Sequence, residues 1–511
     1  MGKITPQMFT GTSVHFAENP IIWADVPDMS IIRVNGMFYM SSTTMHMSPG
    51  LPIMKSKDLV NWELVSYAYD TLADTAELRL ENGRNAYGGG SWASCLRYHN
   101  GVFYASTFSY TTGKTYIFTT DDIENGSWNT ISFTPVLHDH SLYFADDGRV
   151  FMVYGGGDIR IAELNRDLSG IKPNGINTLI IPDAGKMAGE DLMLHAEGSQ
   201  LIKHEGYYYL FNITWPRNGM RTVLVHRADN IFGPYEGRVA LRDRGIAQGS
   251  IIDTPDGGWY AYMFRDFGAV GRIAYIIPVT WEDGWPILGI DGKVPATLNI
   301  PVKNIGVSGI VTSDEFNRNH GDNFLPLAWQ WNHNPDNRLW CLVERSGYLR
   351  LTTGRVDTDV LQARNTLTQR TFGPKSEAIT AIEVSNMRDG DYAGIIALQR
   401  RYGFVGVKME NGIKSIVMVN AGIEVPIEIE SIQLMQDRVC IKIVCDYVNR
   451  NDIAFFFYSL NGEDWIRIGD TLQMSYNMPH FMGYRFGLFN FATKIPGGFV
   501  DFDFFRVSVE K

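Results

Sequence analysis

The sequence predicts an all-β protein in which a five-bladed β-propeller, residues 1–305, is followed by a β-sandwich, residues 306–511. A hairpin turn that recurs five times predicts the propeller, and a second repeated segment supports it. Short strand-like runs with frequent turns predict the sandwich after the repeat stops near residues 300 to 313. Neither half contains a segment with a convincing amphipathic helical period.

Each of the five hairpins joins a strand-like run to an aromatic or β-branched one. Asn-Gly and Asp-Gly in this position favour the positive φ angles of a two-residue turn. The turns recur at intervals of about 50 to 65 residues, which is typical of propeller blades. The five turns are Asn35-Gly36, Asn100-Gly101, Asp147-Gly148, Glu205-Gly206 and Asp256-Gly257. Five copies therefore predict five blades.

A second segment recurs between the hairpins, at the expected outer strands of the blades. In it, an aspartate is followed by an aromatic residue a few positions later. The examples are Asp58 with Trp62, Asp122 with Trp128, and Asp229 with Tyr235. Chance agreement of two separate repeats in one register is improbable, so this segment strengthens the five-fold interpretation.

One residue per repeat lies eight or nine positions before the turn glycine. In a propeller the first strand of each blade lines the central axis, so equivalent positions on five blades should meet at one mouth of the channel. These residues are Asp28, Trp92, Asp139, Glu197 and Gln248. The sequence therefore predicts a site with three carboxyl groups, one indole and one amide.

Three carboxyl groups around one axis suit the hydrolysis of a glycosidic bond. Inversion needs one protonated acid and one ionised base about 6.5–9.5 Å apart, on opposite faces of the sugar. A third carboxylate beside the acid would raise the pKa of that acid by like-charge repulsion. Trp92 offers a face on which the C–H groups of a sugar can pack. Spacing alone leaves open which acid has which role.

Several ordered motifs resemble glycoside hydrolase family 43. They are Asn19-Pro20-Ile21, Pro27-Asp28-Met29, the segment from Ser56 to Trp62, Ser91-Trp92-Ala93-Ser94 and Ala196-Glu197-Gly198. The resemblance covers residues 19 to about 290, and the second half resembles the concanavalin-like β-sandwich of xylosidase-type members. It implies an inverting propeller enzyme of the β-xylosidase, α-L-arabinofuranosidase and arabinanase group.

The resemblance also implies roles for individual residues. Asp28 matches the general base, Glu197 the general acid, and Asp139 the aspartate that tunes the pKa of the acid. Trp92 matches the aromatic residue beside the bound sugar. Arg272 is a weaker match to a substrate-binding arginine, with Arg265 as its rival.

Other residues are expected at the substrate with less support. His46 could bind a sugar hydroxyl or lie at the rim, Trp215 could line a subsite, and Phe108 could instead belong to the core of a blade. Gln248 stands where many family members have a histidine that helps to hold a central calcium. The inference of a structural calcium is therefore weakened, although such an ion stays possible. No cofactor is expected to be required. The spacing of the histidines fits no common metal site.

Composition limits the possible partners. The formal net charge of −11 argues against nucleic acid. No apolar run approaches 18 residues, so no membrane partner is expected. The four cysteines, which fit neither a metal site nor a disulfide framework, are expected to be free. The N-terminus lacks the pattern of a signal peptide, so the compartment stays open: cytoplasmic as given, or secreted or periplasmic if a signal was removed.

The sequence therefore predicts an exo-acting inverting glycosidase on xylan or arabinoxylan, a polysaccharide or oligosaccharide containing xylose or arabinose. One alternative is a carbohydrate-binding propeller without catalysis, which would not need all three acids. A second is a hydrolase directed at arabinan. A third and weaker one is a retaining, fructosidase-like propeller, but its usual Asn-Asp-Pro-Asn-Gly type of segment is absent.

Overall fold

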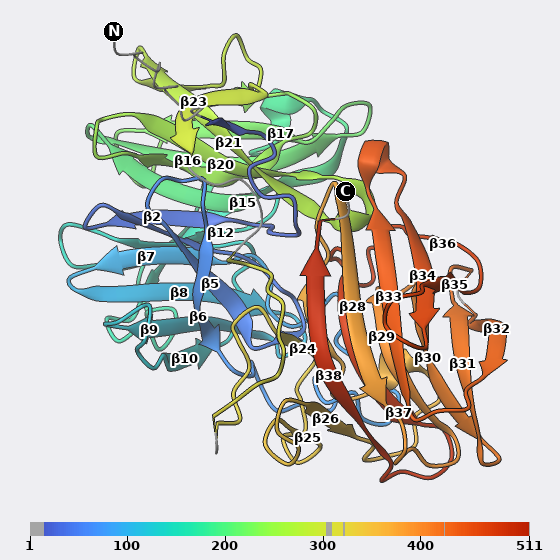
Figure 1. Cartoon of the computed structure of the whole chain (residues 1–511). Helices are drawn as coiled ribbons and strands as arrows, with labels where there is room; N and C mark the ends of the chain where they lie inside the picture. Colours follow the sequence, from blue (N-terminus) through green and yellow to red (C-terminus); the bar gives the residue numbers. More distant parts are fainter. Residues whose placement is uncertain (1–14, 303–308, 320–321, 424, 510–511) are drawn as a thin grey trace, which may run out of the picture.

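A computed structural model describes residues 15–302, 309–319, 322–423 and 425–509. Five four-stranded sheets are followed by two larger sheets that pack face to face (Figure 1). The propeller occupies the blue to yellow-green part of the chain, and the sandwich the orange to red part. The all-β prediction, with a propeller and a sandwich, is confirmed. The predicted boundary between residues 305 and 306 lies outside the described residues.

Each propeller blade is an antiparallel meander of four strands. Blade 1 contains β2 (Ser30–Val34), β3 (Met37–Ser41), β5 (Gly50–Ser56) and β6 (Glu63–Tyr69). Blade 2 contains β7 (Cys95–His99), β8 (Val102–Ser109), β9 (Lys114–Thr120) and β10 (Asn129–Phe133). Blade 3 contains β11 (Ser141–Phe144), β12 (Val150–Tyr154), β13 (Ile159–Leu164) and β14 (Asn177–Ile181). Blade 4 contains β15 (Leu192–His204), β16 (Tyr207–Pro216), β17 (Thr222–Ala228) and β18 (Glu236–Leu241). Blade 5 contains β19 (Ala247–Asp253), β20 (Trp259–Asp266), β21 (Arg272–Glu282) and β22 (Trp285–Leu288).

All five predicted turns join the first and second strands of a blade. In three of them the two-residue turn has positive φ at both positions, as in Asn35 (52°) and Gly36 (79°). The other two are longer loops, in which Gly148 and Gly257 have positive φ but the aspartate before each does not. A longer loop relaxes the turn requirement, so the aspartate keeps an ordinary backbone conformation.

The second repeated segment forms a side-chain turn between the third and fourth strands. Asp58 Oδ1 accepts hydrogen bonds from the backbone N–H groups of Val60 and Asn61, at 2.9 and 2.8 Å. Asp122 makes the same turn in blade 2, and Asn230, beside the predicted Asp229, makes it in blade 4. Asp and Asn recur there because their short side chains imitate a backbone turn.

The ring of blades closes between blades 5 and 1. The inner strand β19 packs against β2, and Trp62 Nε1 donates a hydrogen bond to Tyr262 Oη at 2.8 Å. Outside the ring, β1 (His15–Glu18) pairs with β23 (Thr297–Val302), which ties the start of the propeller to the segment that follows its last blade.

The sandwich consists of two eight-stranded sheets. One contains β4 (Met47–Ser48), β24 (Gln330–Asn332), β27 (Leu367–Arg370), β29 (Asp391–Leu398), β30 (Gly403–Glu410), β31 (Ile413–Asn420), β32 (Ile427–Gln433) and β37 (Arg485–Ala492). The other contains β25 (Trp340–Cys341), β26 (Leu349–Thr352), β28 (Lys375–Glu383), β33 (Arg438–Asp446), β34 (Ile453–Ser459), β35 (Ile466–Arg467), β36 (Leu472–Gln473) and β38 (Phe499–Ser508). Strand β4 belongs to a loop of blade 1, so the propeller completes a sheet of the sandwich.

The only helices among the described residues are four 3₁₀ turns of three residues each. They are η1 (Lys186–Ala188), η2 (Gly268–Val270), η3 (Val360–Gln362) and η4 (Val448–Arg450). Within the same residues, no helix has the length and apolar character needed to cross a membrane. All four cysteines are free, as predicted.

Three histidines and a tyrosine form a buried cluster where the propeller meets the sandwich. Tyr87 of the propeller stacks on His480 of the sandwich, with ring centroids 4.0 Å apart and planes 3° apart. The ring of His46 lies 4.5 Å from that of His333, and His46 Nε2 is 3.1 Å from Asn332 Oδ1. Burial, followed by the charge of Arg485, lowers the pKa of His46 to about 3. Burial also lowers the pKa values of His333 and His480 far below their usual range.

This cluster predicts that acid weakens the folded state. The three histidines stay neutral when folded but bind protons in the unfolded chain near pH 6.5. Their contribution to the free energy of unfolding is therefore complete above pH 6.5 and is lost as the pH falls below it. The loss is about 1.4 kcal/mol per pH unit for each histidine.

Urea denaturation at pH 7.5, 6.5 and 5.5 measures this loss. His480→Phe keeps a ring on Tyr87 and removes one titrating group, so its stability should fall less steeply between pH 6.5 and 5.5 than that of the wild type. An identical slope in the two proteins would show that His480 does not contribute.

Candidate active site

The five predicted axial residues lie at or near the starts of the inner strands. Asp28, Trp92 and Asp139 precede β2, β7 and β11, while Glu197 and Gln248 lie within β15 and β19. Neighbouring inner strands pack against one another around the ring. Asp28, Asp139 and Gln248 line the same small cavity on the axis. Three of the five predicted residues, from blades 1, 3 and 5, therefore meet at one end of the channel.

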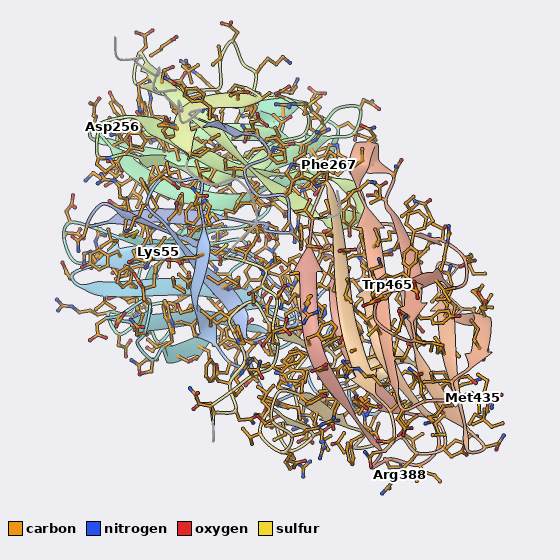
Figure 2. All side chains as sticks on the ribbon, in the orientation of Figure 1. Lys55, Asp256, Phe267, Arg388, Met435 and Trp465 are labelled. Carbon is orange, nitrogen blue, oxygen red and sulfur yellow. The ribbon has the colours of Figure 1, made fainter. Side chains whose placement is uncertain are left out.

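This end of the channel faces the sandwich. The hairpin turns lie at the opposite ends of the inner strands, and Asp256, in one of these turns, lies on the side of the propeller away from the sandwich (Figure 2). Phe267, in contrast, lies where the propeller and the sandwich meet (Figure 2). The axial residues thus lie in a pocket to which both domains can contribute.

The backbone at the axis is unusual. Asp28, Asp139 and Gln248 have φ angles of 54°, 44° and 55°, and Gly198, directly after Glu197, has 68°. Residues other than glycine rarely adopt this left-handed region, which costs free energy. Strand pairing is also interrupted by bulges beside Glu197 and Gln248. Bulges and left-handed residues re-aim side chains, and such strain is typical of functional sites.

Asp28 is paired with the buried Arg272. Arg272 Nη1 donates to both carboxylate oxygens of Asp28, at 3.2 and 3.3 Å, and its backbone N–H donates to Asp25. Asp28 and Arg272 are 7% and 2% exposed, so solvent screens their interaction weakly. Burial raises the pKa of Asp28 above its usual value, although Arg272 opposes this rise.

Asp139, Glu197 and His138 form a second ionisable cluster. Their nearest polar atoms all lie within 4.8 Å of one another. Asp139 Oδ2 accepts a hydrogen bond of 2.9 Å from the backbone N–H of Gly198, and His138 Nε2 lies 2.9 Å from Glu197 Oε2. Burial, followed by the charge of Glu197, raises the pKa of Asp139 to about 7. The cluster therefore keeps a proton near neutral pH.

Aromatic side chains from both domains surround these groups. Trp92 lies 6.2 Å from Phe108 and 5.3 Å from Phe481, which belongs to the sandwich, with tilted or stacked planes. The guanidinium of Arg272 lies 4.7 Å from the centre of the Phe481 ring and donates to the Phe481 carbonyl. Phe481 has a φ of 52°, a strained conformation for a bulky residue. The sandwich thus supplies one side of the pocket.

The structure places the other predicted residues outside this inner group. Phe108 is fully buried beneath Trp92. His46 is 1% exposed and belongs to the domain interface. Trp215 lies on β16, opposite Leu194. The guanidinium carbon of Arg221 lies 5.1 Å from the centre of the Trp215 ring. Arg265, the rival of Arg272, lies over Phe267 instead.

Several side chains that line the axial cavity already have protein partners, which bears on the fit of a calcium ion. Gln200 accepts a hydrogen bond from Ser30 and donates to Ser94, and both ring nitrogens of His140 have protein partners. Asp28 is held by Arg272. Ca²⁺ takes six to eight oxygen ligands, water among them, so these side chains alone would not complete its coordination. We therefore derive no step through a metal.

Sequence reasoning gave no role in the site to three residues. Phe481 contacts Arg272 across a separation of 209 residues, and no local pattern marks it. Tyr110 lies directly after β8, and its Oη is 3.0 Å from His138 Nδ1. His138 stands beside Asp139, and that adjacency to an axial acid was the one available signal.

Comparisons with known proteins agree with this two-domain fold. The pattern of the family described as "Glycosyl hydrolases family 43" matches residues 17–286. The pattern described as "Beta xylosidase C-terminal Concanavalin A-like domain" matches residues 313–508.

Named relatives cover most of the chain. A β-xylosidase from Formosa agariphila is 29% identical over 95% of this chain and 89% of its own length. A putative β-xylosidase from Xylanibacter ruminicola is 30% identical over 88% and 82%. A solved bifunctional GH43-CE protein from Bacteroides eggerthii is 58% identical, with a TM-score of 0.96, over 98% of this chain and 64% of that one. The chain thus spans less than two thirds of that protein. The chain described here, whose residues 17–286 match the family model, belongs to glycosyl hydrolase family 43.

Proposed function

We propose that the protein is an inverting exo-glycosidase that releases xylose or arabinose from xylan or arabinoxylan. The observation that carries the proposal is the grouping of three carboxyl groups from three blades. Asp28 and Asp139 line one axial cavity, Glu197 lies beside Asp139, and Arg272 pairs with Asp28. The β-xylosidases among its relatives support a pentose substrate.

In this proposal the two ionisable clusters act on opposite faces of the sugar. Asp28, held by Arg272, accepts a proton from the water that attacks the anomeric carbon. Glu197 donates a proton to the leaving oxygen while the glycosidic C–O bond breaks. Asp139 lies close enough to Glu197 to influence its protonation and holds the backbone of Gly198. Trp92 packs against the sugar ring.

Closure of the pocket by the sandwich supports exo action. Phe481 reaches Trp92 and Arg272 from the second domain, so a long polysaccharide could not pass freely through this side of the pocket. A chain end fits such a pocket better than the middle of a chain. The alternative of a binding propeller without catalysis is not favoured, because the chain belongs to a hydrolase family and keeps all three acids.

Hydrolysis of two aryl glycosides tests the proposal. The β-D-xylopyranoside and the α-L-arabinofuranoside are incubated separately, and NMR records the anomer released first. Release of either sugar with inverted configuration is the expected result and names the substrate. A retained configuration would contradict the mechanism. Release from neither would require a test on arabinan, and no activity there would overturn the proposal.

The two clusters predict a bell-shaped dependence of kcat/KM on pH. Activity should fall at low pH as Asp28 takes up a proton, at a pH above the usual 3.8 because burial raises its pKa. It should fall again near pH 7, where Asp139, which lies beside Glu197, loses its proton. Initial rates between pH 4 and 9 measure both limbs, and constant activity up to pH 9 would contradict the assignment.

A further inference from the structure

His138 lies between Glu197 and Tyr110, with one ring nitrogen directed at each. Nε2 is 2.9 Å from Glu197 Oε2, and Nδ1 is 3.0 Å from Tyr110 Oη. The backbone is also fixed, because the His138 carbonyl accepts a hydrogen bond from the N–H of Gly155. A ring held at both nitrogens has one orientation, and that orientation points Nε2 at the carboxyl group.

An aromatic ring and a glycine border the imidazole. The ring of Phe108 lies 5.2 Å away, nearly edge-on. A Cβ at Gly156 would be in ordinary van der Waals contact with the pair, 3.6 Å from His138 Cδ2 and 3.9 Å from Glu197 Oε2. The side chains of His138 and Glu197 are each about one quarter exposed, so the pair still faces the pocket.

The charges around the ring favour its protonated form. Glu197 faces it from β15, Asp139 Oδ2 lies 4.0 Å from Nε2, and Tyr110 and His140 are its other titratable neighbours. Burial works to lower the pKa of His138, but the hydrogen bond to Glu197 and the two carboxylates together raise it above its usual value. An N–H group at Nε2 is thus directed at Glu197.

We propose that His138 is a positioning residue for the general acid: its Nε2–H holds the carboxyl of Glu197 and stabilises the carboxylate that remains after the proton has moved to the leaving oxygen. The inference rests on the proposed role of Glu197. A hydrogen bond to a charged oxygen is stronger than one to a neutral oxygen, so this contact strengthens as the proton leaves. Tyr110 holds the ring in the matching orientation.

His138→Phe tests the inference, because phenylalanine keeps the ring against Phe108 and removes both nitrogens. Two substrates are compared. Xylobiose has a poor leaving group, a sugar hydroxyl that must be protonated, whereas the 2,4-dinitrophenyl xyloside releases 2,4-dinitrophenolate without protonation. The corresponding arabinosides are used if arabinose is the substrate. We expect kcat/KM on the poor leaving group to fall by about 10- to 100-fold, with a change of less than about 3-fold on the activated one. The alkaline limb should move to higher pH by roughly half to one unit, since a cation beside the carboxyl is lost.

Two further variants separate positioning from folding. His138→Gln keeps an N–H donor and should recover part of the loss, whereas His138→Asn is one methylene shorter and should recover less. If His138→Phe does not fold, this pair carries the test. His99→Phe, at a stacked histidine near the opposite end of the blade, is the matched control and should leave both activities unchanged.

The outcomes distinguish this inference from the proposed function. Equal losses on both substrates with an unmoved alkaline limb would reduce His138 to a packing residue. If Glu197→Gln, measured in the same series, shows the leaving-group dependence and His138→Phe does not, only the inference fails. If Glu197→Gln does not show it either, the assignment of the general acid fails, and the inference fails with it.

Discussion

Glu197→Gln should lower kcat/KM on xylobiose by about 10²- to 10⁴-fold, the range that general acid catalysis supplies. Glutamine has nearly the same shape but has no acidic proton for the leaving oxygen. On the 2,4-dinitrophenyl glycoside, whose leaving group needs no proton, most of the activity should remain. The alkaline limb of the pH profile should also weaken or disappear, because the acid whose proton the reaction uses is gone.

The control for this experiment lies on the same hairpin. Glu205, whose side chain is 80% exposed, occupies the turn between β15 and β16, and Glu205→Gln makes the same chemical change away from the pocket. It should leave both activities at the wild-type level. Full activity of Glu197→Gln on xylobiose, or equal losses on the two substrates, would show that Glu197 is not the acid.

Much of the propeller could be predicted because its signals are local. The hairpin turns and the aspartate turns each depend on a few adjacent residues, and their recurrence defines the blades. Once the blades are counted, geometry brings one residue of each inner strand to the axis. Asp28, Asp139 and Gln248 indeed line one cavity, although they are far apart in sequence.

The sandwich was predictable in its strands but not in its contacts. Short strand-like runs were expected there, and two of them, β26 and β38, pair in the same sheet. The placement of Phe481 against Trp92, and of His46 against His333, depends on how two folded domains pack. No short stretch of sequence encodes such packing. His46 was therefore expected at the pocket, whereas in the structure it belongs to the domain interface.

The strained backbone conformations at the axis could not be predicted from the sequence either. Asp28 and Asp139 adopt left-handed backbone conformations although neither is followed by glycine. Sequence rules assign such conformations to glycine or asparagine first. The surrounding sheet overrides this preference, and its stability offsets the cost of holding the two acids in place.

Asp28→Asn should abolish turnover of both kinds of substrate, in contrast to Glu197→Gln. The attacking water needs a base whichever group leaves, so a better leaving group cannot compensate. A loss of at least about 10³-fold is expected on each substrate, near the upper range for general base catalysis. Removing the charge also leaves Arg272 buried without its partner, which costs about 3–5 kcal/mol of stability. Thermal unfolding must therefore show that the variant is folded at the assay temperature.

Azide distinguishes loss of the base from loss of the fold. Azide is a nucleophile that carries no proton, so it can attack the anomeric carbon without a base and displace 2,4-dinitrophenolate from the activated substrate. In Asp28→Asn it should restore turnover and give a glycosyl azide of inverted configuration, which NMR identifies. In Glu197→Gln, where the base is intact, azide should add little. Turnover of Asp28→Asn without azide would assign the base to another group, and an azide product of retained configuration would replace inversion with a two-step mechanism.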